Sequence, residues 1–463
     1  MIAKVFFSLV VAVCAISLQA GFKAGFARVD ITPAIGTPLA GYYSRRASDG
    51  VLDPLYARCV AVSDGENRAI VLSIDNLHLY DAAFKQVRDA VSQKTGVPIE
   101  AVFVACTHTH TGPASFVPKG PDATLIRASN KLTADGCAEA AAKALADLAP
   151  SKILIGRGEA KGISFIRRYL MKDGSVRTNP GPNNPRIAHA IGDADEQLQL
   201  VRFVREGKKE IAVVNFQCHP DVIGGKKVSA DWPGLSCGYL ESAMNGSVCA
   251  MFINGAQGDV NHIKTKIAPG EVVLQRYEMS KHMARVVAGA ALATWGLCKE
   301  VNSGKISAGV SQVEVEPNKG TAEEVATAKN VIELHKAGRT SEIKGVSKTV
   351  NIAAAYRIMS ARTRPDKVTI PVSMVTIGKS LAFGGFPGEP FTWMGTELKA
   401  KSPFTMTIPA CCVNASQGYF PVRSAYTNKG GYENATARYK AGTAEKLVDG
   451  LLDILKSAYD EKK

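Results

Sequence analysis

The sequence predicts an α/β fold with mixed, largely parallel β-sheets flanked by helices in one large domain. Short runs rich in β-branched and aromatic residues alternate with helical patterns, which is typical of layered α/β proteins. Several of these apolar runs end in polar residues broken by glycine or proline, where open α/β sheets place their sites. The sequence contains no internal repeat, low-complexity tract or linker with a shift in composition, so we expect a single domain over residues 21–463.

The first half of the chain predicts strands and helices in alternation. In chain order we expect strands at 56–62 and 69–74, a helix at 82–94, a strand at 101–105, an Ala-rich helix at 123–147 and strand-like sequence over 153–166. The helices have apolar residues three to four positions apart, and the first one closes at Gly96. A Gly-, Pro- and Asn-rich segment over 174–185 is long enough to be a surface loop or a lid.

The second half continues the pattern to the C-terminal region. We expect strands at 198–204, 211–217 and 248–253, and helices at 235–245 and 271–295. Further strands at 307–317 and 367–377 enclose a polar helix at 322–337, and two more follow at 381–386 and 407–413. An amphipathic helix at 443–458 completes the predicted elements.

Composition and charge indicate a globular protein that can adsorb to anionic surfaces. The 463 residues are 46% hydrophobic and 21% charged, which fits a sizeable core without a long disordered arm. The formal net charge is +14, with basic residues dispersed apart from a mild cluster over 344–367. This charge favours contact with lipid headgroups or a cell envelope. We expect no nucleic-acid binding, because no basic–aromatic stripe or recognised motif accompanies the charge.

The N-terminal segment resembles a secretory signal peptide. Lys4 precedes an apolar stretch over residues 5–18, and the small residue Ala20 closes the segment. We therefore predict a cleaved signal over residues 1–20 and a secreted or periplasmic mature protein. A retained membrane anchor is the alternative, but the apolar stretch is short for a bilayer span.

The cysteines do not form a metal-binding pattern. Removal of Cys14 with the signal leaves nine of the ten cysteines, and none of them forms a CxxC pair. Most lie in apolar, strand-like surroundings, so we expect buried free thiols, with one or two disulfides open as an alternative in an exported protein. A zinc knuckle is not expected.

Two histidines follow the apolar strand at 101–105. His108 and His110 are spaced i, i+2, and this spacing places both side chains on one face of an extended chain. A Gly-Pro pair follows them at Gly112 and Pro113. With only eight histidines in the chain, this pair is a candidate metal site. Two surface histidines at a strand end are the alternative.

Four other predicted strands also end in polar clusters. After the strand that leads to His108 and His110, the clusters are marked by His219, Asp259, Glu389 and the segment 414–419. If these strands share an edge, their imidazoles, carboxylates and a tyrosine converge. Nitrogen and oxygen ligands without a thiolate suit zinc, and three or so protein ligands plus water describe a catalytic zinc site. Each of these motifs alone is more often part of an ordinary turn. Their recurrence at the ends of several predicted strands is what predicts a metal hydrolase.

The same motifs resemble those of neutral ceramidases, which are secreted zinc amidases. The run Thr107-His108-Thr109-His110-Thr111-Gly112-Pro113 is similar to their ThrHisThrHis element, and 387–392 is similar to their Pro-Gly-Glu-Phe-Thr. Segment 414–419 resembles their Asn-Ala-Tyr-x-x-Tyr, while 229–231 and 258–260 match a Ser-x-Asp and a Gly-Asp-Val. The likeness keeps the same order from about Phe26 to Tyr439, and so covers the family's catalytic domain.

The resemblance implies a role for each matching residue. The zinc ligands would be His108, His219, Glu389 and Tyr419. His110 would lie beside the water held by the zinc, Arg167 would be a cation on the substrate side, and Ser229 would fall at the serine to which the family gives a catalytic role. A neutral His110 could assist proton transfer, and Tyr419 or Arg167 could stabilise the oxyanion. The carboxylates behind the histidines would come from Asp195, Asp231 and Asp259.

Bland alternatives accompany two of these residues. The alternative for Ser229 is a cap on the following helix, and the alternative for Arg167 is a solvated or structurally paired side chain. We assign no role to the remaining histidines at 189, 262, 282 and 335.

The resemblance implies ceramide hydrolysis to a sphingoid base and a fatty acid, in sphingolipid metabolism, but two departures keep other functions open. We expect no C-terminal β-sandwich domain of the ceramidase kind. The motif at 414–416 is Asn-Ala-Ser in place of Asn-Ala-Tyr. The same scaffold could therefore hydrolyse another amide, a peptide or an ester, and a third possibility is an inactive homologue that binds the cell envelope.

Overall fold

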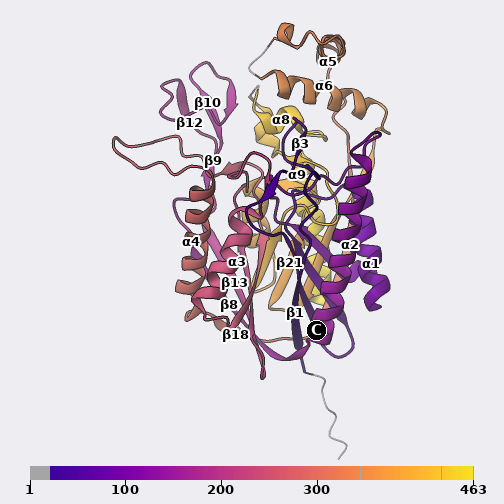
Figure 1. Ribbon diagram of the computed structural model, residues 1–463, viewed down its shortest axis with the longest axis vertical. Helices are drawn as coiled ribbons and strands as arrows, with labels where there is room; N and C mark the ends of the chain where they lie inside the picture. The colour runs from indigo at the N-terminus through magenta and orange to yellow at the C-terminus, as the bar shows by residue number, and fades with distance from the viewer. Residues whose placement is uncertain (1–20, 345–346, 429, 462–463) are drawn as a thin grey trace, which may run out of the picture.

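A nine-stranded mixed sheet forms the centre of the computed structural model, which describes residues 21–344, 347–428 and 430–461 (Figure 1). Its strands lie in the order β16 (Val248–Asn254), β14 (Glu210–Phe216), β13 (Gln197–Arg205), β8 (Ala149–Glu159), β1 (Lys23–Asp30), β5 (Tyr56–Ser63), β6 (Arg68–Ile74) and β7 (Val102–Cys106), and β18 (Lys299–Val301) pairs with β8. Most of these strands are buried on both faces, which explains their continuous apolar sequences.

A second, four-stranded sheet packs face to face on the first. It has the order β19 (Ile306–Val315), β20 (Val368–Ile377), β21 (Leu381–Gly385) and β23 (Met406–Ala410). The largest core cluster contains residues of both sheets, and the rings of Phe103 on β7 and Phe383 on β21 lie 6.3 Å apart. The site described below lies where strands of the two sheets end together.

Helices cover the outer faces of the two sheets. The large sheet is covered by α1 (Asp81–Thr95), α2 (Ala123–Ala146), α3 (Asp231–Ala243) and α4 (Arg276–Trp295). The smaller sheet packs against α7 (Thr392–Lys401) and α9 (Thr443–Asp460), and the short α8 (Tyr432–Thr436) lies near the cavity. The predicted α/β class, with mixed sheets flanked by helices, is confirmed.

The expectation that parallel strands predominate is wrong. Parallel pairing in the two sheets joins β6 to β7, β14 to β16 and β21 to β23, and the other pairs are antiparallel. The reason is that β5–β6, β13–β14 and β20–β21 are hairpins, with glycines of left-handed φ (Gly65, Gly207 and Gly378) in their turns. The parallel pairs nevertheless include the strands that lead to the site.

A helical hairpin inserted between β19 and β20 stands apart from the sheets, at the top of Figure 1. It consists of α5 (Ala322–Lys336) and α6 (Lys348–Arg362), which share a small apolar core of their own. A capping box at Thr321 and Glu324 begins α5. The sequence predicted α5 but not α6.

Five further groups of short strands occupy the connections. They are β11 (Val176–Thr178), β10 (Arg168–Met171) and β12 (Ile187–Ala190) in one sheet, and the pairs β15 (Lys227–Val228) with β4 (Gly50–Val51), β17 (Val260–Asn261) with β9 (Phe165–Ile166), β2 (Pro38–Leu39) with β3 (Arg46–Ala47), and β22 (Glu389–Pro390) with β24 (Tyr419–Phe420). The segment 174–185, predicted as a loop or a lid, contains β11 in this small sheet. The helix predicted at 235–245 begins earlier, at Asp231, and the one predicted at 271–295 begins later, at Arg276.

Two sequence predictions concern the N-terminal segment and the cysteines. The signal peptide over residues 1–20 lies outside the described residues. None of the helices in the described ranges combines the length and the apolar character needed to cross a bilayer. The nine cysteines of the described chain are free thiols, seven of them buried, as the apolar contexts indicated.

Candidate active site

Four strand ends bring a cluster of metal-binding side chains together. After β7, β14, β21 and β23 come, in that order, His108, His219, Glu389 and Tyr419. Nε2 of His108 lies 3.3 Å from Oε2 of Glu389, and Nε2 of His219 lies 3.5 Å from the same oxygen. The Tyr419 hydroxyl lies 3.5 Å from Nε2 of His219. The structure therefore brings together side chains that the strand-end pattern predicted to converge.

His110 lies against both of these histidines. Its ring centroid is 5.3 Å from that of His108 and 5.3 Å from that of His219. The pair arises differently from the expectation, because β7 ends at Cys106 and His108 has a left-handed φ of 74°. A turn, and not an extended strand, places the two imidazoles side by side. The His110 backbone is fixed by its N–H, which donates to Pro220 O at 3.1 Å, and by its carbonyl, which accepts from Arg46 Nη2 at 2.8 Å.

Backbone carbonyls orient the two histidines that face Glu389. Nδ1 of His108 lies 2.8 Å from Leu77 O, and Nδ1 of His219 lies 3.1 Å from Gln257 O. Because a carbonyl can only accept, each Nδ1 carries the proton and each Nε2 has a free lone pair. Both lone pairs are thus available on the Glu389 side, as metal ligation requires.

The spacing of these atoms fits a bound metal ion. Two ligand atoms on a tetrahedral zinc, with bonds of about 2.1 Å, lie about 3.4 Å apart, and the separations from Glu389 to the two histidines are 3.3 and 3.5 Å. Oε2 of Glu389 is buried and accepts no hydrogen bond from the described residues. His108, His110 and His219 also offer ring nitrogens within 4.8 Å of one another, so this triad can hold a metal as well.

The Glu389 main chain is held by two neighbouring segments. Glu389 pairs with Tyr419 in the β22–β24 ladder, and its N–H donates to Gly418 O at 2.9 Å. On the other side Gly258 N donates to Pro390 O at 2.7 Å, and a Cβ at Gly258 would lie 2.6 Å from Glu389 O. Only glycine allows this close approach. The carboxylate therefore projects from a backbone with little freedom to move.

Burial and mutual contact set the charges of the cluster. Burial opposes ionisation of Glu389, but the neighbouring His108 and His219 outweigh it and hold its pKa below the ordinary value. Burial lowers the pKa of His219, and Arg167 lowers it further. Burial and the adjacent His108 lower the pKa of His110 to about 4. His110 and His219 are therefore neutral at neutral pH, and the carboxylate of Glu389 is ionised. Neutral imidazoles beside a carboxylate can bind a metal cation.

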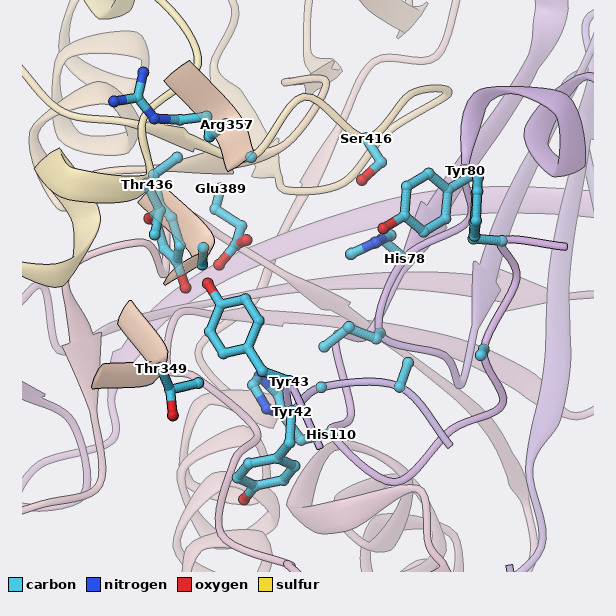
Figure 2. Close-up of a pocket in the computed structure, with 18 of the residues that line it drawn as sticks. Tyr42, Tyr43, His78, Tyr80, His110, Thr349, Arg357, Glu389, Ser416 and Thr436 are labelled. Carbon is cyan, nitrogen blue, oxygen red and sulfur yellow. The ribbon is translucent and has the colours of Figure 1, made fainter. Parts of the chain in front are cut away.

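His108, His110, Glu389 and Tyr419 line the floor of a cavity of about 900 Å³, whereas His219 contacts this floor without lining the cavity. Its walls come from the 39–44 segment, the 77–80 segment, α6 and the 416–438 region. Figure 2 shows the Tyr43 hydroxyl directed toward Glu389, with His78 and Tyr80 across the opening. A second cavity of about 460 Å³ adjoins the first, and Tyr80, Ser115 and Phe116 line both. This space is large enough for a small-molecule or lipid ligand.

Arg167 supports Tyr419 from behind and is not among the residues that line the cavity. Its guanidinium lies 5.4 Å from the centre of the Tyr419 ring, pairs with buried Glu433 at 2.7 Å, and donates to Gly258 O at 2.7 Å. Burial opposes its charge, but Tyr419 and Glu433 raise the pKa of Arg167 above the ordinary value. Arg167 was predicted to be a cation on the substrate side. In the structure its guanidinium contacts the Tyr419 ring and does not line the cavity.

Ser229 is completely buried away from the residues that line the cavity. Its hydroxyl donates to Asp53 Oδ2 at 2.7 Å, and its carbonyl accepts from the hydroxyls of Thr109 and Thr111 at 2.7 and 3.0 Å. These threonines flank His110. The geometry therefore gives Ser229 a positioning contact with the His110 loop, and the catalytic role implied by the resemblance stays a prediction.

The three aspartates expected behind the histidines have other partners. Asp195 pairs with Lys399, and Asp231 accepts from the Val222 and Ile223 N–H groups at 3.0 and 3.1 Å. Asp259 accepts from the N–H and hydroxyl of Thr392 at 2.7 and 2.8 Å. The expectation was wrong because the histidines use carbonyls, whereas these carboxylates anchor the loops that carry the site.

Other residues at the site were missed by the sequence reasoning. Asp221 Oδ1 lies 3.2 Å from Nδ1 of His262. The sequence does contain a signal for Asp221, because this residue directly follows His219 and Pro220 at a strand end. His78 lines the cavity 6.4 Å from the His108 ring. The hydroxyls of Tyr43 and Tyr432 lie 3.1 Å apart on the cavity wall. Neither tyrosine follows a predicted strand, so no local signal marks them.

Comparisons with known proteins give a consistent result. The family model described as neutral/alkaline non-lysosomal ceramidase, N-terminal, matches residues 22–262. Neutral ceramidase A of Dictyostelium discoideum is 26% identical over 269 residues, which cover 53% of this chain and 36% of that protein. The aligned part thus spans about a third of the relative's length.

Solved structures share the fold over nearly the whole chain. The crystal structure of neutral ceramidase from Pseudomonas aeruginosa has a TM-score of 0.73 at 18% identity, covering 96% of this chain and 75% of that one. A structure described as a ceramidase complexed with C2 matches with the same TM-score and identity, covering 96% and 76%. Both comparisons agree with the α/β architecture described above.

Proposed function

The chain belongs to the neutral/alkaline non-lysosomal ceramidase family, and we propose that it is a zinc-dependent amidohydrolase that cleaves the N-acyl bond of ceramide-like lipids, releasing a sphingoid base and a fatty acid. One observation carries the proposal. Oε2 of Glu389 lies 3.3 and 3.5 Å from the free Nε2 atoms of two histidines, at the floor of a cavity of about 900 Å³.

The proposed zinc ligands are those that face one another across this floor, namely His108, His219, Glu389 and Tyr419. A zinc ion bound there supplies Lewis acidity, which polarises an acyl carbonyl and acidifies water. We choose these four over the histidine triad because His110 then keeps its unpartnered ring nitrogens for proton transfer. They supply two nitrogen and two oxygen donors, a set that suits zinc.

His110 would move the protons of the reaction. With its pKa lowered to about 4, it is neutral at neutral pH and can accept a proton from the attacking water. The imidazolium formed in this way is a strong acid. It would return the proton to the leaving amine nitrogen as the carbon–nitrogen bond breaks, so the histidine ends the cycle neutral.

Arg167 and Tyr419 would stabilise negative charge on the reacting carbonyl oxygen. The buried guanidinium lies against the Tyr419 ring and keeps its charge beside the phenol. A fixed cation in a water-poor site favours developing oxyanion charge more strongly than it would in solvent. In this proposal Arg167 acts through Tyr419 and without touching the substrate.

A second candidate function is hydrolysis of another amide, a peptide or an ester by the same residues. Ser416 lines the cavity at the position where the ceramidase motif has tyrosine, so the altered residue faces the substrate. Loss of a ring at this wall enlarges the space beside the reacting bond and would admit a different acyl or amine group. An inactive homologue that binds the cell envelope is the third candidate.

Metal analysis together with a substrate panel would distinguish these functions. We expect purified protein to contain zinc and to hydrolyse long-chain N-acyl-sphingosine in preference to short-chain amides and esters. Bound zinc with a preference for another amide or an ester would favour the second function. Absence of both zinc and hydrolysis would overturn the enzyme proposal and favour an envelope-binding homologue.

We also propose that the mature protein is secreted or periplasmic and begins at Gly21. Support comes from the sequence pattern of residues 1–20, where one lysine, an apolar stretch and a small residue follow one another. N-terminal sequencing of protein from the exported fraction should give Gly21 as the first residue. Recovery of the uncleaved chain with the membrane fraction would support the retained anchor.

A further inference from the structure

The mouth of the cavity gathers exposed aromatic side chains. Six large aromatic residues are exposed in the described ranges, and five of them line the cavity of about 900 Å³. These five form what we call the aromatic rim: Tyr42, Tyr43, Tyr80, Phe116 and Tyr356. Phe116 is 59% exposed and Tyr356 is 41% exposed. Such a concentration at one opening is not expected of single apolar residues scattered over a surface.

The rim is assembled from four separate segments. Tyr42 and Tyr43 lie in the turn between β2 and β3, Tyr80 precedes α1, Phe116 follows β7 and Tyr356 lies on α6. Figure 2 shows Tyr42 and Tyr43 together on one side of the pocket and Tyr80 on another. Because four segments that are distant in sequence contribute, the rim does not follow one amphipathic element.

Two basic residues accompany the rim. Arg127 lines the adjoining cavity with Tyr80 and Phe116, and Lys348 directly precedes Thr349 on the cavity wall. Neither side chain forms an ion pair with an acidic residue in the portion of the chain covered by the structure, in contrast to Arg45, which pairs with Asp122. Aromatic rings with cations beside them match the interface of an anionic bilayer, where rings bury among headgroups and cations meet lipid phosphates.

We infer that the aromatic rim is a docking surface for an anionic phospholipid bilayer, and that the cavity opens onto the membrane. This inference rests on the proposed function in one respect, since a lipid amide must leave the bilayer to reach the floor. Docking by the rim brings the opening against the headgroups, so a lipid can enter without crossing water. The net charge, +14 for the whole sequence and +13 without Lys4, favours the same anionic partner.

Vesicle sedimentation without any amide substrate tests the inference independently of hydrolysis. The vesicles are phosphatidylcholine alone, or equal parts phosphatidylcholine and phosphatidylglycerol. We expect the wild-type protein to bind the mixed vesicles and to bind the neutral ones more weakly. The double variant Phe116→Ser/Tyr356→Ser should bind the mixed vesicles about tenfold more weakly, through loss of buried ring area.

A matched control separates the rim from exposed apolar area in general. Leu297 is 71% exposed between α4 and β18 and does not line either cavity. Leu297→Ser should bind vesicles as the wild-type protein does. The charge variant Arg127→Gln/Lys348→Gln should weaken binding to mixed vesicles about thirtyfold, from about 1 kcal/mol for each cation, and should leave binding to neutral vesicles unchanged.

Several results would overturn the inference. These are failure of the wild-type protein to bind mixed vesicles, wild-type binding by the folded rim variant, and an equal loss in Leu297→Ser. Melting curves followed by circular dichroism establish that each variant is folded. A rim variant that binds vesicles normally but shifts from dimer to monomer in analytical ultracentrifugation would show that a second copy of the chain covers the rim.

Discussion

The candidate metal site on the floor of the cavity and the α5–α6 hairpin beside it are held by different kinds of contact. On the floor, backbone groups fix the side chains, as Leu77 O and Gln257 O do for His108 and His219. The hairpin has its own small core, and α6 packs on α8. Arg357 Nη1 of α6 also donates to Asn318 O, in the segment between β19 and α5, at 3.0 Å. The floor is thus fixed by hydrogen bonds to the backbone, whereas the hairpin is held mainly by a core of its own, and we expect changes in the hairpin to affect the floor little. The chemistry should depend on the first region and the choice of substrate on the second.

Loss of a proposed ligand should have the largest effect. His108→Ala removes one of two free Nε2 atoms that face Glu389. We expect zinc to be absent by metal analysis and hydrolysis to fall by more than about 100-fold, since even loss of a group that supports a ligand costs 10–100-fold. Full activity in a zinc-free His108→Ala protein would rule out the proposed site.

Substitution of His110 should separate chemistry from metal binding. In His110→Gln we expect zinc to stay bound and kcat to fall by about 100- to 10,000-fold, the usual contribution of a proton-transferring residue. Metal analysis and steady-state kinetics on the same preparation provide the measurement. If zinc is lost along with activity, the histidine triad and not the four-residue set holds the metal.

Gly258→Ala tests how rigidly the floor holds Glu389. The added Cβ would lie 2.6 Å from Glu389 O and 2.8 Å from Pro390 O, and backbone atoms cannot move aside as a flexible side chain can. We expect the free energy of unfolding to fall by about 1–3 kcal/mol, together with a lower zinc content.

Gly238→Ala is the matched control for this change. It lies within α3 with no atom inside 4 Å of the added Cβ, so stability should rise by up to about 1 kcal/mol through helix propensity. Chemical denaturation of both variants provides the comparison, and equal effects would contradict a steric role for Gly258.

The contribution of Asp53, which holds Ser229 behind the His110 loop, to the free energy of unfolding should depend on pH. Burial raises the pKa of Asp53 from 3.8 to about 6, although Ser229 and the Ala230 N–H donate hydrogen bonds to it. Because the folded state binds this proton more tightly than the unfolded chain, the stabilisation is complete below about pH 4 and is lost as the pH rises through about 6.

Asp53→Asn should remove this dependence. Relative to the variant, the wild-type free energy of unfolding should fall by roughly 1–3 kcal/mol between those pH values. Parallel stability profiles of the two proteins in denaturant titrations would contradict the assignment.

A change inside the hairpin should have the smallest effect on chemistry. Ile358→Ala removes a buried side chain from the core shared by α5 and α6. We expect zinc content and kcat on a short-chain amide to stay within about twofold of wild type, while KM for a long-chain substrate rises several-fold. A large loss of zinc would show that the hairpin and the floor are coupled after all.

Local patterns were sufficient to predict the strand ends but not the groups behind them. Apolar runs broken by Gly or Pro marked His108, His219 and Glu389, because strand burial and turn chemistry both act over a few residues. The partners of the histidines, Leu77 O and Gln257 O, left no trace, since every residue has a carbonyl and only the fold chooses one. The contact between Tyr43 and Tyr432 was also unpredictable, because these residues are far apart in the sequence and only the fold brings them together.

Strand direction and α6 were also beyond local patterns. An apolar strand buried on both faces has the same sequence in parallel and antiparallel sheets, so the hairpins of the large sheet were misjudged. The helix α6 has its apolar residues directed at α5 and at the cavity, and so lacks the single continuous stripe that identified α9.

The left-handed backbone at His108 has a consequence for how such chains diverge. A non-glycine residue with a φ of 74° is disfavoured by about 1 kcal/mol, and glycine or asparagine would relieve this strain. Selection for the imidazole must therefore outweigh the gain in stability that glycine or asparagine would give at this position. In descendants that abandon the chemistry, position 108 should drift to glycine or asparagine sooner than position 219, and this drift would identify lineages that keep the scaffold without its reaction.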